Sequence, residues 1–433
     1  MGPPTPGPTG VTYTTPAGGT PIGVNDVWFG ERTPDPGGQR AMTVAEAATE
    51  FSLLGVNRFR QFPLHDALWH GVQPQAGGFL WQGPDAVIPA FPHMALPTLF
   101  DLQFANATPP WRRDTGMSFT ATCDGDTDAY VAAVVDRYKE QVTYWEIGNE
   151  MDHWRAADPG VNPPGREQRP ANRPAEGYSP EEQGRFLACV AATIRKHEPS
   201  AKIVMPGMGE ISDQVLDAWL TGVISGAGKD TFDVINYHFY EPWDRLPGAH
   251  AHLRAKLAEL GLADREVWLT ETGATSDPTL DKRTNYPNSE SEQAADVFRR
   301  MTLAYGYGDR TVLWHTLVDS ESGDANPWRG YGLLTNTDRR RKMSWYAFQL
   351  LAHEVLPFDT ATVLEAGLDR YVVHFTRPGG GQRWVAWGRG SLARPAGATR
   401  ETTVLITGSP PWAPLTGETI PLTEVPVLIA TSG

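Results

Sequence analysis

The chain has 433 residues, 40% of them apolar, with 15 tryptophans and a formal net charge of −14. The apolar content is enough for a sizeable core, which argues against wholesale disorder. The acidic balance argues against a nucleic-acid partner, because phosphate binding requires a basic face. The length exceeds one small domain and suits a barrel of about 250 residues or more with an appended module.

Residues 1–15 begin with the Pro- and Gly-rich run MGPPTPGPTG, which predicts a flexible segment. This run has neither the positive start nor the apolar stretch of a signal peptide. The chain also has no apolar run of the length that spans a membrane, so we expect no membrane partner. Localisation stays open: secreted or periplasmic if an export signal was removed, cytoplasmic otherwise. The oligomeric state is unassigned, with a monomer favoured.

Between residues 16 and 354, short apolar runs alternate with helical stretches, which is typical of parallel strands joined by crossover helices. Eight strands are predicted, at residues 21–28, 56–62, 97–104, 142–149, 202–207, 233–240, 266–271 and 311–318. Helices are predicted between them at 43–54, 128–139, 180–197, 215–225, 249–260 and 291–305, with Thr43 and Ser179 as N-caps. Eight repeats indicate a closed (β/α)8 TIM barrel rather than an open sheet.

The pattern changes after a final helix predicted at 344–354. Residues 371–376, 383–387, 402–406 and 425–430 resemble strands, separated by Gly- and Pro-rich turns. We therefore predict a small all-β, sandwich-like module at 355–433, to which residues 11–15 add a strand. Its expected role is that of a brace whose aromatic side chains pack on the barrel, with carbohydrate binding as the alternative.

The two cysteines, Cys123 and Cys189, are too few for a disulfide scaffold. Cys189 lies on an amphipathic stretch and is interpreted as a buried thiol, with pairing to Cys123 as the alternative. His65, His70 and His93 lack the spacing of metal ligands. We expect no metal and no cofactor.

Two long connections follow predicted strands. One runs from Glu150 to Tyr178, and the other runs from Asp319 to Arg341 and carries Trp328 and Tyr331. Long loops without secondary structure are usually functional or disordered. In a barrel the loops after the strands form the mouth where the chemistry takes place.

Carboxylates end two of the predicted strands. The run YWEIGNE ends at Glu150, and the run VWLTE ends at Glu271. Cleavage of a glycosidic bond needs one carboxyl group that protonates the leaving oxygen and a second that attacks or activates water. The run NYHFY adds His238 and Tyr240, which share one face of their strand because side chains alternate.

Asn-Glu after the fourth strand, His-x-Tyr after the sixth and Glu after the seventh resemble glycoside hydrolase clan A, whose members are retaining (β/α)8 barrels. Within the clan the motifs look most like family 39, with family 5 as a close competitor. The resemblance implies that Glu150 is the acid/base and Glu271 the nucleophile, about 5–5.5 Å apart for retention. It also implies that Asn149 donates a hydrogen bond to the sugar 2-hydroxyl.

The same resemblance assigns further residues to the substrate site. Arg60 matches the strand-two arginine that keeps the nucleophile ionised, although Arg58 has the same facing. Tyr240 is expected to bond Glu271, and His238 to line the site. Trp314 resembles the aromatic floor of the sugar subsite, and three tryptophans are candidates for further sugar platforms: Trp28, Trp154 and Trp328. Asp152 and His153 follow Glu150, where many clan members have Pro-Asn.

We therefore predict a retaining glycoside hydrolase that acts on a neutral polysaccharide or oligosaccharide. One alternative is a carbohydrate-binding barrel that keeps the pocket without the reaction, and another is a barrel enzyme of unrelated chemistry. Within the first prediction, a β-xylosidase-like exo-enzyme and an endo-glycanase both remain open.

Overall fold

The computed structural model describes residues 6–15, 21–27, 29, 42–61, 69–100, 123–154, 179–280, 288–320 and 329–432, without the side chains of residues 61, 70, 153 and 154. The chain forms two compact units, which are described separately. Unit 1 contains Met1–Arg60, Phe239–His252 and Val267–Gly433, and unit 2 contains Gln61–His238 and Leu253–Glu266.

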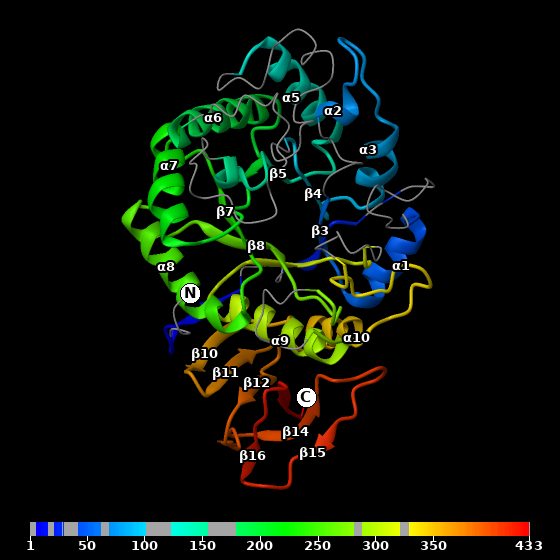
Figure 1. Cartoon of the computed structure of the whole chain (residues 1–433), viewed down its shortest axis with the longest axis vertical. Helices are drawn as coiled ribbons and strands as arrows, with labels where there is room; N and C mark the ends of the chain where they lie inside the picture. The colour runs from blue at the N-terminus through cyan, green and yellow to red at the C-terminus, as the bar shows by residue number, and fades with distance from the viewer. Residues whose placement is uncertain are drawn as a thin grey trace. The chain divides into compact units, whose positions relative to one another are not determined.

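Eight strands form one sheet in the order β4-β3-β2-β9-β8-β7-β6-β5. Figure 1 labels β3, β4, β5, β7 and β8 of this sheet. A parallel bridge between Thr98 and Glu146 joins the ends of β4 and β5, the outermost strands of this order. The predicted (β/α)8 barrel is thereby confirmed. The strands are β2 (Ile22–Asn25), β3 (Arg58–Gln61), β4 (Ala95–Pro97), β5 (Tyr144–Glu146), β6 (Lys202–Val204), β7 (Val234–Phe239), β8 (Glu266–Thr272) and β9 (Thr311–His315).

Each observed strand overlaps its predicted range. The overlap is smallest at β4, which begins at Ala95 and shares only Pro97 with its prediction, and residues 101–104 of that prediction lie outside the described residues.

Helices occupy the predicted connections. They are α1 (Val44–Leu54), α2 (Trp69–Val72), α3 (Gln82–Val87), η1 (Ile88–Ala90), α5 (Gly125–Tyr138), η2 (Met151–Trp154), α6 (Pro180–His197), π-helical η3 (Val215–Leu220), α7 (Thr221–Ala227), η4 (Trp243–Arg245), α8 (Leu246–Glu259), α9 (Glu290–Gly306), α10 (Met343–Leu350) and π-helical η5 (Leu351–Val355). Thr43 and Ser179 are confirmed as N-caps, each in a capping box with the glutamate three residues later. The sequence did not predict α2 or α3, which are only four and six residues long.

The two cysteines form a disulfide between Cys123 and Cys189. This corrects the interpretation of Cys189 as a buried thiol. Cys189 lies on α6 but is only half-buried, so it faces the segment that precedes α5 rather than the core. The bond closes a loop over a sequence separation of 66 residues, and closing a long loop stabilises a fold by limiting the unfolded chain.

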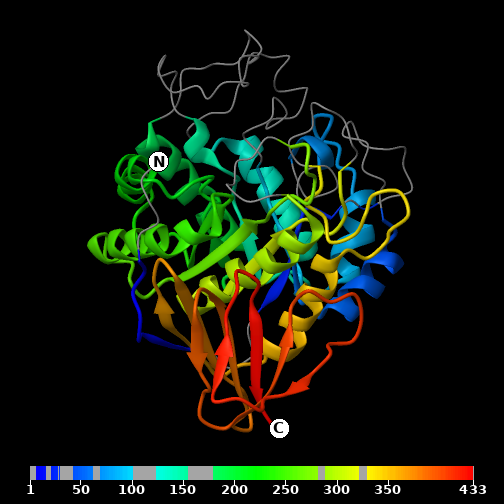
Figure 2. The same ribbon diagram turned by 60° about the horizontal axis from the view of Figure 1, so that its bottom comes forward.

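The C-terminal residues form the predicted β-module. Its main sheet has the order β1-β10-β11-β12-β17-β14-β15, and β13 pairs with β16. Figure 2 shows its strands from β10 onward as orange to red arrows. The strands are β1 (Thr12–Thr14), β10 (Thr360–Ala366), β11 (Arg370–Thr376), β12 (Gln382–Gly388), β13 (Ser391–Ala393), β14 (Ala398–Thr403), β15 (Ala413–Pro414), β16 (Thr419–Pro421) and β17 (Val427–Thr431). As expected, the N-terminal segment adds a strand, because β1 pairs antiparallel with β10.

Aromatic side chains of the module pack on barrel elements of unit 1. Trp243 of η4 lies edge-to-face against Tyr371 at 5.0 Å and Trp387 at 5.7 Å between ring centroids. On α9, a Cβ at Gly306 would lie 2.7 Å from a methyl group of Val363, so the helix approaches the module sheet at a residue without a side chain. These contacts support the expected bracing role.

Unit 1 contains barrel strands as well as residues 355–433, so the division into units does not test the predicted boundary between residues 354 and 355. That boundary stays a prediction. Within the described part of the chain, the helices are too short or too polar to cross a membrane.

Candidate active site

Both carboxylate oxygens of Glu271 are held by side chains of unit 1. Glu271 lies near the end of β8 and is 7% exposed. Arg60 donates from Nη1 to Oε1 at 2.6 Å, and the Tyr240 hydroxyl donates to Oε2 at 2.9 Å. A guanidinium is always protonated, and a charge-assisted hydrogen bond favours the ionised carboxylate. Glu271 is therefore held in one orientation beside a permanent cation.

A second layer supports Arg60 from β2. Asn25 lies in register with Arg60 on β3 and with His315 on β9. Arg60 Nη1 donates to Asn25 Oδ1 at 3.0 Å, which leaves Nδ2 of the amide facing His315 Nδ1 at 3.1 Å. Because an amide nitrogen only donates, His315 Nδ1 accepts, and a neutral ring then carries its proton on Nε2.

The structure separates the two candidate arginines of β3. Arg58 is 8% exposed, and its guanidinium lies 5.4 Å from the ring centroid of Trp268. Arg60 is fully buried and bonds Glu271. Although the two arginines lie on the same face of β3, they have different partners. Arg60 is the arginine that contacts the Glu271 carboxylate.

Trp314 of β9 is fully buried, and its indole N–H donates to the carbonyl of Tyr331 at 3.1 Å. A ring without exposed surface has no face for a sugar, so the expected role of Trp314 as a subsite floor finds no support in this conformation. The next residue, His315, is 8% exposed and lies edge-to-face against Tyr240 at 5.9 Å. His315 rather than Trp314 therefore joins the surroundings of Glu271.

Glu150 lies in unit 2, four residues beyond the end of β5. Its backbone adopts φ 40°, in the left-handed region, and its N–H donates to the carbonyl of Gly207 at 2.8 Å. His238 of β7 places Nδ1 2.9 Å from Glu150 Oε1. The imidazole packs on Gly207, where a Cβ would lie 2.2 Å from His238 Nε2. A glycine at 207 is therefore required for this imidazole to reach Glu150.

A third carboxylate, Glu146, is fully buried at the end of β5. It accepts hydrogen bonds from the Thr98 hydroxyl at 2.9 Å, Asn236 Nδ2 at 2.9 Å and the Gly207 N–H at 3.2 Å. These bonds join the tips of four strands or the turns after them. Buried polar groups of this kind rigidify their surroundings when they are fully satisfied. Glu146 is thus a support for the segment that carries Glu150.

The remaining predicted residues divide into two groups. Asn149 is 1% exposed and forms a parallel bridge with Gly207, which places it beside the Glu150 backbone. Asp152, which departs from the clan pattern, is fully buried and accepts from the Gly209 N–H at 3.0 Å. Trp28, Trp328 and the side chain of Trp154 lie outside the described residues.

Sequence reasoning missed Asn25, Glu146, His315 and Tyr331. Asn25 and His315 carried a usable signal, because each is a polar residue in the second half of a predicted apolar strand, like Arg60 and Glu271. Glu146 alternates with apolar residues and gave no such signal. Tyr331 lies in a loop, and only the fold brings it to β9.

The barrel, its β-module and these strand-end side chains define a (β/α)8 fold of the glycoside hydrolase type. Two solved structures of family 39 share it. A family 39 glycoside hydrolase from the gut symbiont Bacteroides cellulosilyticus WH2 has a TM-score of 0.67 and 19% identity, covering 95% of this chain and 81% of its own. A GH39 β-xylosidase from Caulobacter crescentus has a TM-score of 0.60 and 15% identity, covering 98% of both chains.

The catalytic domain of GH30 xylanase C from Talaromyces cellulolyticus is also similar, with a TM-score of 0.59, 14% identity and coverage of 98% of this chain and 100% of that domain. At these identities the likeness establishes the fold, and the predicted resemblance to clan A and family 39 is confirmed at that level. No family model matches the sequence. No curated protein matches it either.

Proposed function

We propose that the chain is a retaining glycoside hydrolase with Glu271 as nucleophile and Glu150 as acid/base. The observation that carries this proposal is the double hold on Glu271, by Arg60 on one oxygen and by Tyr240 on the other. A nucleophilic carboxylate must be ionised and aimed. The arginine favours the charge, and the two bonds from different strands fix the direction of the lone pairs.

Glu150 has the opposite requirement, because an acid/base must exchange its proton twice in each cycle. Its carboxylate meets an imidazole, with His238 Nδ1 2.9 Å from Glu150 Oε1. A histidine can donate from a protonated Nδ1 to the carboxylate or accept at Nδ1 from the carboxylic acid. His238 therefore suits both protonation states of Glu150.

The reaction follows in two displacements. Glu150 transfers its proton to the glycosidic oxygen while a Glu271 oxygen bonds the anomeric carbon, and the leaving group departs as an alcohol. The Glu150 carboxylate then takes a proton from water, whose oxygen displaces Glu271 and releases the sugar. Two inversions at one carbon give net retention. The proposal requires both glutamates to face one sugar linkage, and parallel strands of a barrel do gather their C-terminal ends on one face.

The substrate is a carbohydrate, and β-xylosides are the first class to test. Solved structures with this fold include a β-xylosidase and a xylanase. Asn149 is the residue proposed to bond the sugar 2-hydroxyl, since it precedes Glu150 and is held beside it through Gly207.

The test is an activity screen over aryl β-xylosides, other aryl glycosides and polysaccharides including xylan, with products sized by chromatography. Glu271→Ala should abolish cleavage while the fold survives in circular dichroism, and the surface variant Glu259→Ala on α8 serves as the matched control. NMR of the first product should show the anomer of the substrate. Near-normal cleavage by Glu271→Ala, or an inverted first product, contradicts the proposal.

A further inference from the structure

Tyr331 contacts both groups of side chains that hold Glu271, one that begins at Tyr240 and one that begins at His315. Its ring lies 6.0 Å from the ring of Tyr240 and 5.8 Å from that of His315, in edge-to-face geometry. Tyr240 bonds one oxygen of Glu271 directly. His315 reaches the other oxygen through Asn25 and Arg60, as described above. A shift of the Tyr331 ring would therefore change the positions of both Tyr240 and His315, because edge-to-face aromatic pairs have specific geometry.

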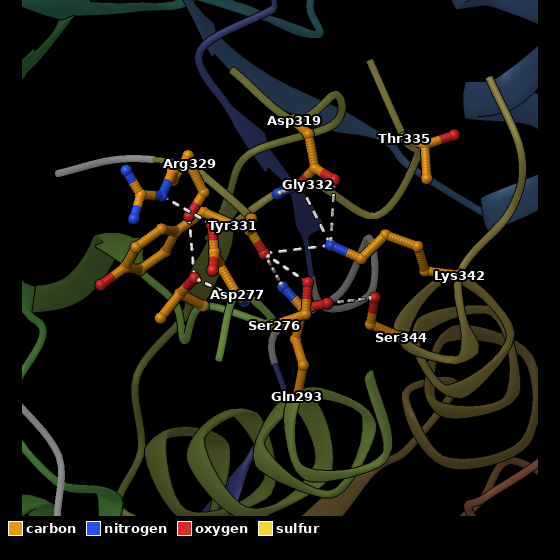
Figure 3. Close-up of polar contacts among 12 residues, drawn as sticks. Ser276, Asp277, Gln293, Asp319, Arg329, Tyr331, Gly332, Thr335, Lys342 and Ser344 are labelled. Carbon is orange, nitrogen blue, oxygen red and sulfur yellow. Dashed lines mark hydrogen bonds and ion pairs between the residues drawn. The ribbon is translucent and has the colours of Figure 1, made fainter. Parts of the chain in front are cut away.

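The residue before Tyr331 is fixed by its carbonyl group. The Gly330 carbonyl oxygen accepts from the Ser276 N–H at 2.9 Å, the Ser276 hydroxyl at 3.1 Å and Gln293 Nε2 at 2.8 Å. Lys342 Nζ donates to the same oxygen at 3.0 Å. Figure 3 shows these donors converging on one point beside Tyr331.

The residue after Tyr331 is fixed by its N–H. Gly332 donates to Asp319 Oδ1 at 2.7 Å. Lys342 Nζ bonds the same carboxylate, at 3.0 Å to Oδ1 and 3.3 Å to Oδ2 (Figure 3). One ion pair, Lys342 with Asp319, thus holds the neighbours of Tyr331 on both sides.

This ion pair is buried, with side-chain exposures of 1% for Lys342 and 16% for Asp319. Burial lowers the pKa of Lys342, and it raises the pKa of Asp319 although the lysine opposes that rise. A buried ion pair is a poor source of stability, because the cost of removing two charges from water rivals their attraction. Its value is better sought in the geometry that it imposes.

We propose that Lys342 and Asp319 are positioning residues, which act through Tyr331 on the orientation of Tyr240, His315 and hence Glu271. The proposal rests on the proposed function for its kinetic consequence. Its structural consequence, the placement of Tyr331 against His315, is independent of any activity.

The kinetic test compares Lys342→Met with the wild type on the aryl glycoside that the wild type cleaves best. We expect kcat to fall about 10- to 100-fold, since small misplacements of a reacting group cost this much, while KM stays within about twofold. The matched control is Arg383→Met, which removes a cation of the β-module that is also 1% exposed and paired with Glu354. It should lower the melting temperature and leave both constants unchanged.

A double-mutant cycle asks whether Lys342 acts through Tyr331. If it does, the double variant with Tyr331→Ala and Lys342→Met should be no slower than Tyr331→Ala alone, because the lysine has lost its target. Additive losses overturn the proposal. Should Lys342→Met fail to fold, Asp319→Asn, which preserves the shape of the carboxylate, takes its place in the cycle.

A second readout does not depend on turnover. In protein with 15N-labelled histidine, the ring signal of His315, identified by its loss in His315→Gln, should shift in Lys342→Met and Tyr331→Ala but not in Arg383→Met. If the wild type cleaves no glycoside, the proposed function fails while this signal still tests the positioning. A folded Lys342→Met protein with unchanged kcat and an unchanged His315 signal overturns it.

Discussion

The surroundings of the two glutamates differ in kind. Glu271 has both oxygens held, one by Arg60, and its side chain is 9% exposed. Glu150 meets the imidazole of His238, its side chain is 14% exposed, and its backbone adopts a left-handed conformation. A left-handed conformation is costly for a residue with a side chain and is kept where the surroundings over-determine it. Arg60 therefore favours the charged form of Glu271, whereas the surroundings of Glu150 hold its backbone in one conformation.

This difference matches a division of chemical labour. A nucleophile needs a constant charge, which a guanidinium supplies because it does not lose its proton. An acid/base needs a constant place and a variable charge, which a strained backbone and an imidazole allow. Substitutions that remove one glutamate or one of its supporting side chains test this comparison.

After Glu271→Ala, which should abolish cleavage, the largest expected effect belongs to Glu150→Ala. With poor leaving groups, kcat/KM should fall by up to about 10⁴-fold, the upper range for general acid catalysis, whereas activated aryl glycosides should lose much less in their first step. Added azide should partly restore turnover of the activated substrates by attacking the glycosyl-enzyme without a base. An equal loss on both substrate classes, without azide rescue, would break the assignment of Glu150.

The next effect is that of Arg60→Met, with kcat/KM lower by about 10³-fold. Without the cation the ionised form of Glu271 loses its charge-assisted hydrogen bond, so the acidic limb of the pH–rate profile should move to higher pH. Arg58→Met is the matched control, because Arg58 lies on the same strand against Trp268. Equal profiles for the two variants would show that Glu271 does not depend on Arg60 for its charge.

Tyr240→Phe should have a smaller effect. It removes one hydrogen bond to a charged group, worth about 1.5–3 kcal/mol, and kcat should fall by about 10- to 100-fold. Tyr305→Phe is the control, since its hydroxyl donates to the Pro21 carbonyl at 2.8 Å and has no bond to Glu271 among the described contacts. Matching kinetics for both variants would show that the Tyr240 hydroxyl does not support Glu271.

The sequence predicted the parts of this comparison that depend on strand ends. Parallel strands of a barrel end on a common face, so carboxylates at two strand ends marked Glu150 and Glu271 without knowledge of any contact. The resemblance to clan A added Arg60. The alternation of short apolar runs with helical stretches predicted all eight strands. The capping residues Thr43 and Ser179 predicted the starts of α1 and α6.

The sequence did not predict what depends on packing between distant segments. Trp314 and His315 are neighbours at the end of β9, and which of them faces Glu271 is set by the register of β9 with β2. Tyr331 is brought to the site by a loop held through Lys342 and Asp319, and nothing local marks it. The disulfide between Cys123 and Cys189 depends likewise on the approach of two remote segments.

The smallest effect concerns an exposed counterpart of the Arg60–Glu271 pair. Arg340 bonds Glu290 at the start of α9 at 2.6 Å, with side-chain exposures of 53% and 31%. The Arg340 hydrogen bond lowers the pKa of Glu290 below its usual 4.5, despite partial burial. A carboxylate with a lowered pKa contributes stability above its unfolded pKa and loses that contribution as the pH falls through the folded value.

Glu290→Gln should therefore cost about 0.5 kcal/mol of unfolding free energy at pH 7, the scale of an exposed ion pair that solvent screens. The difference from wild type should shrink as the pH falls from 4.5 through the lowered pKa of Glu290, because the protonated glutamic acid is as uncharged as glutamine. Urea unfolding across this pH range measures it. A cost of several kcal/mol, or one that grows in acid, would show that solvent exposure does not weaken this ion pair. Exposure would then not distinguish the Arg340–Glu290 pair from the buried Arg60–Glu271 pair.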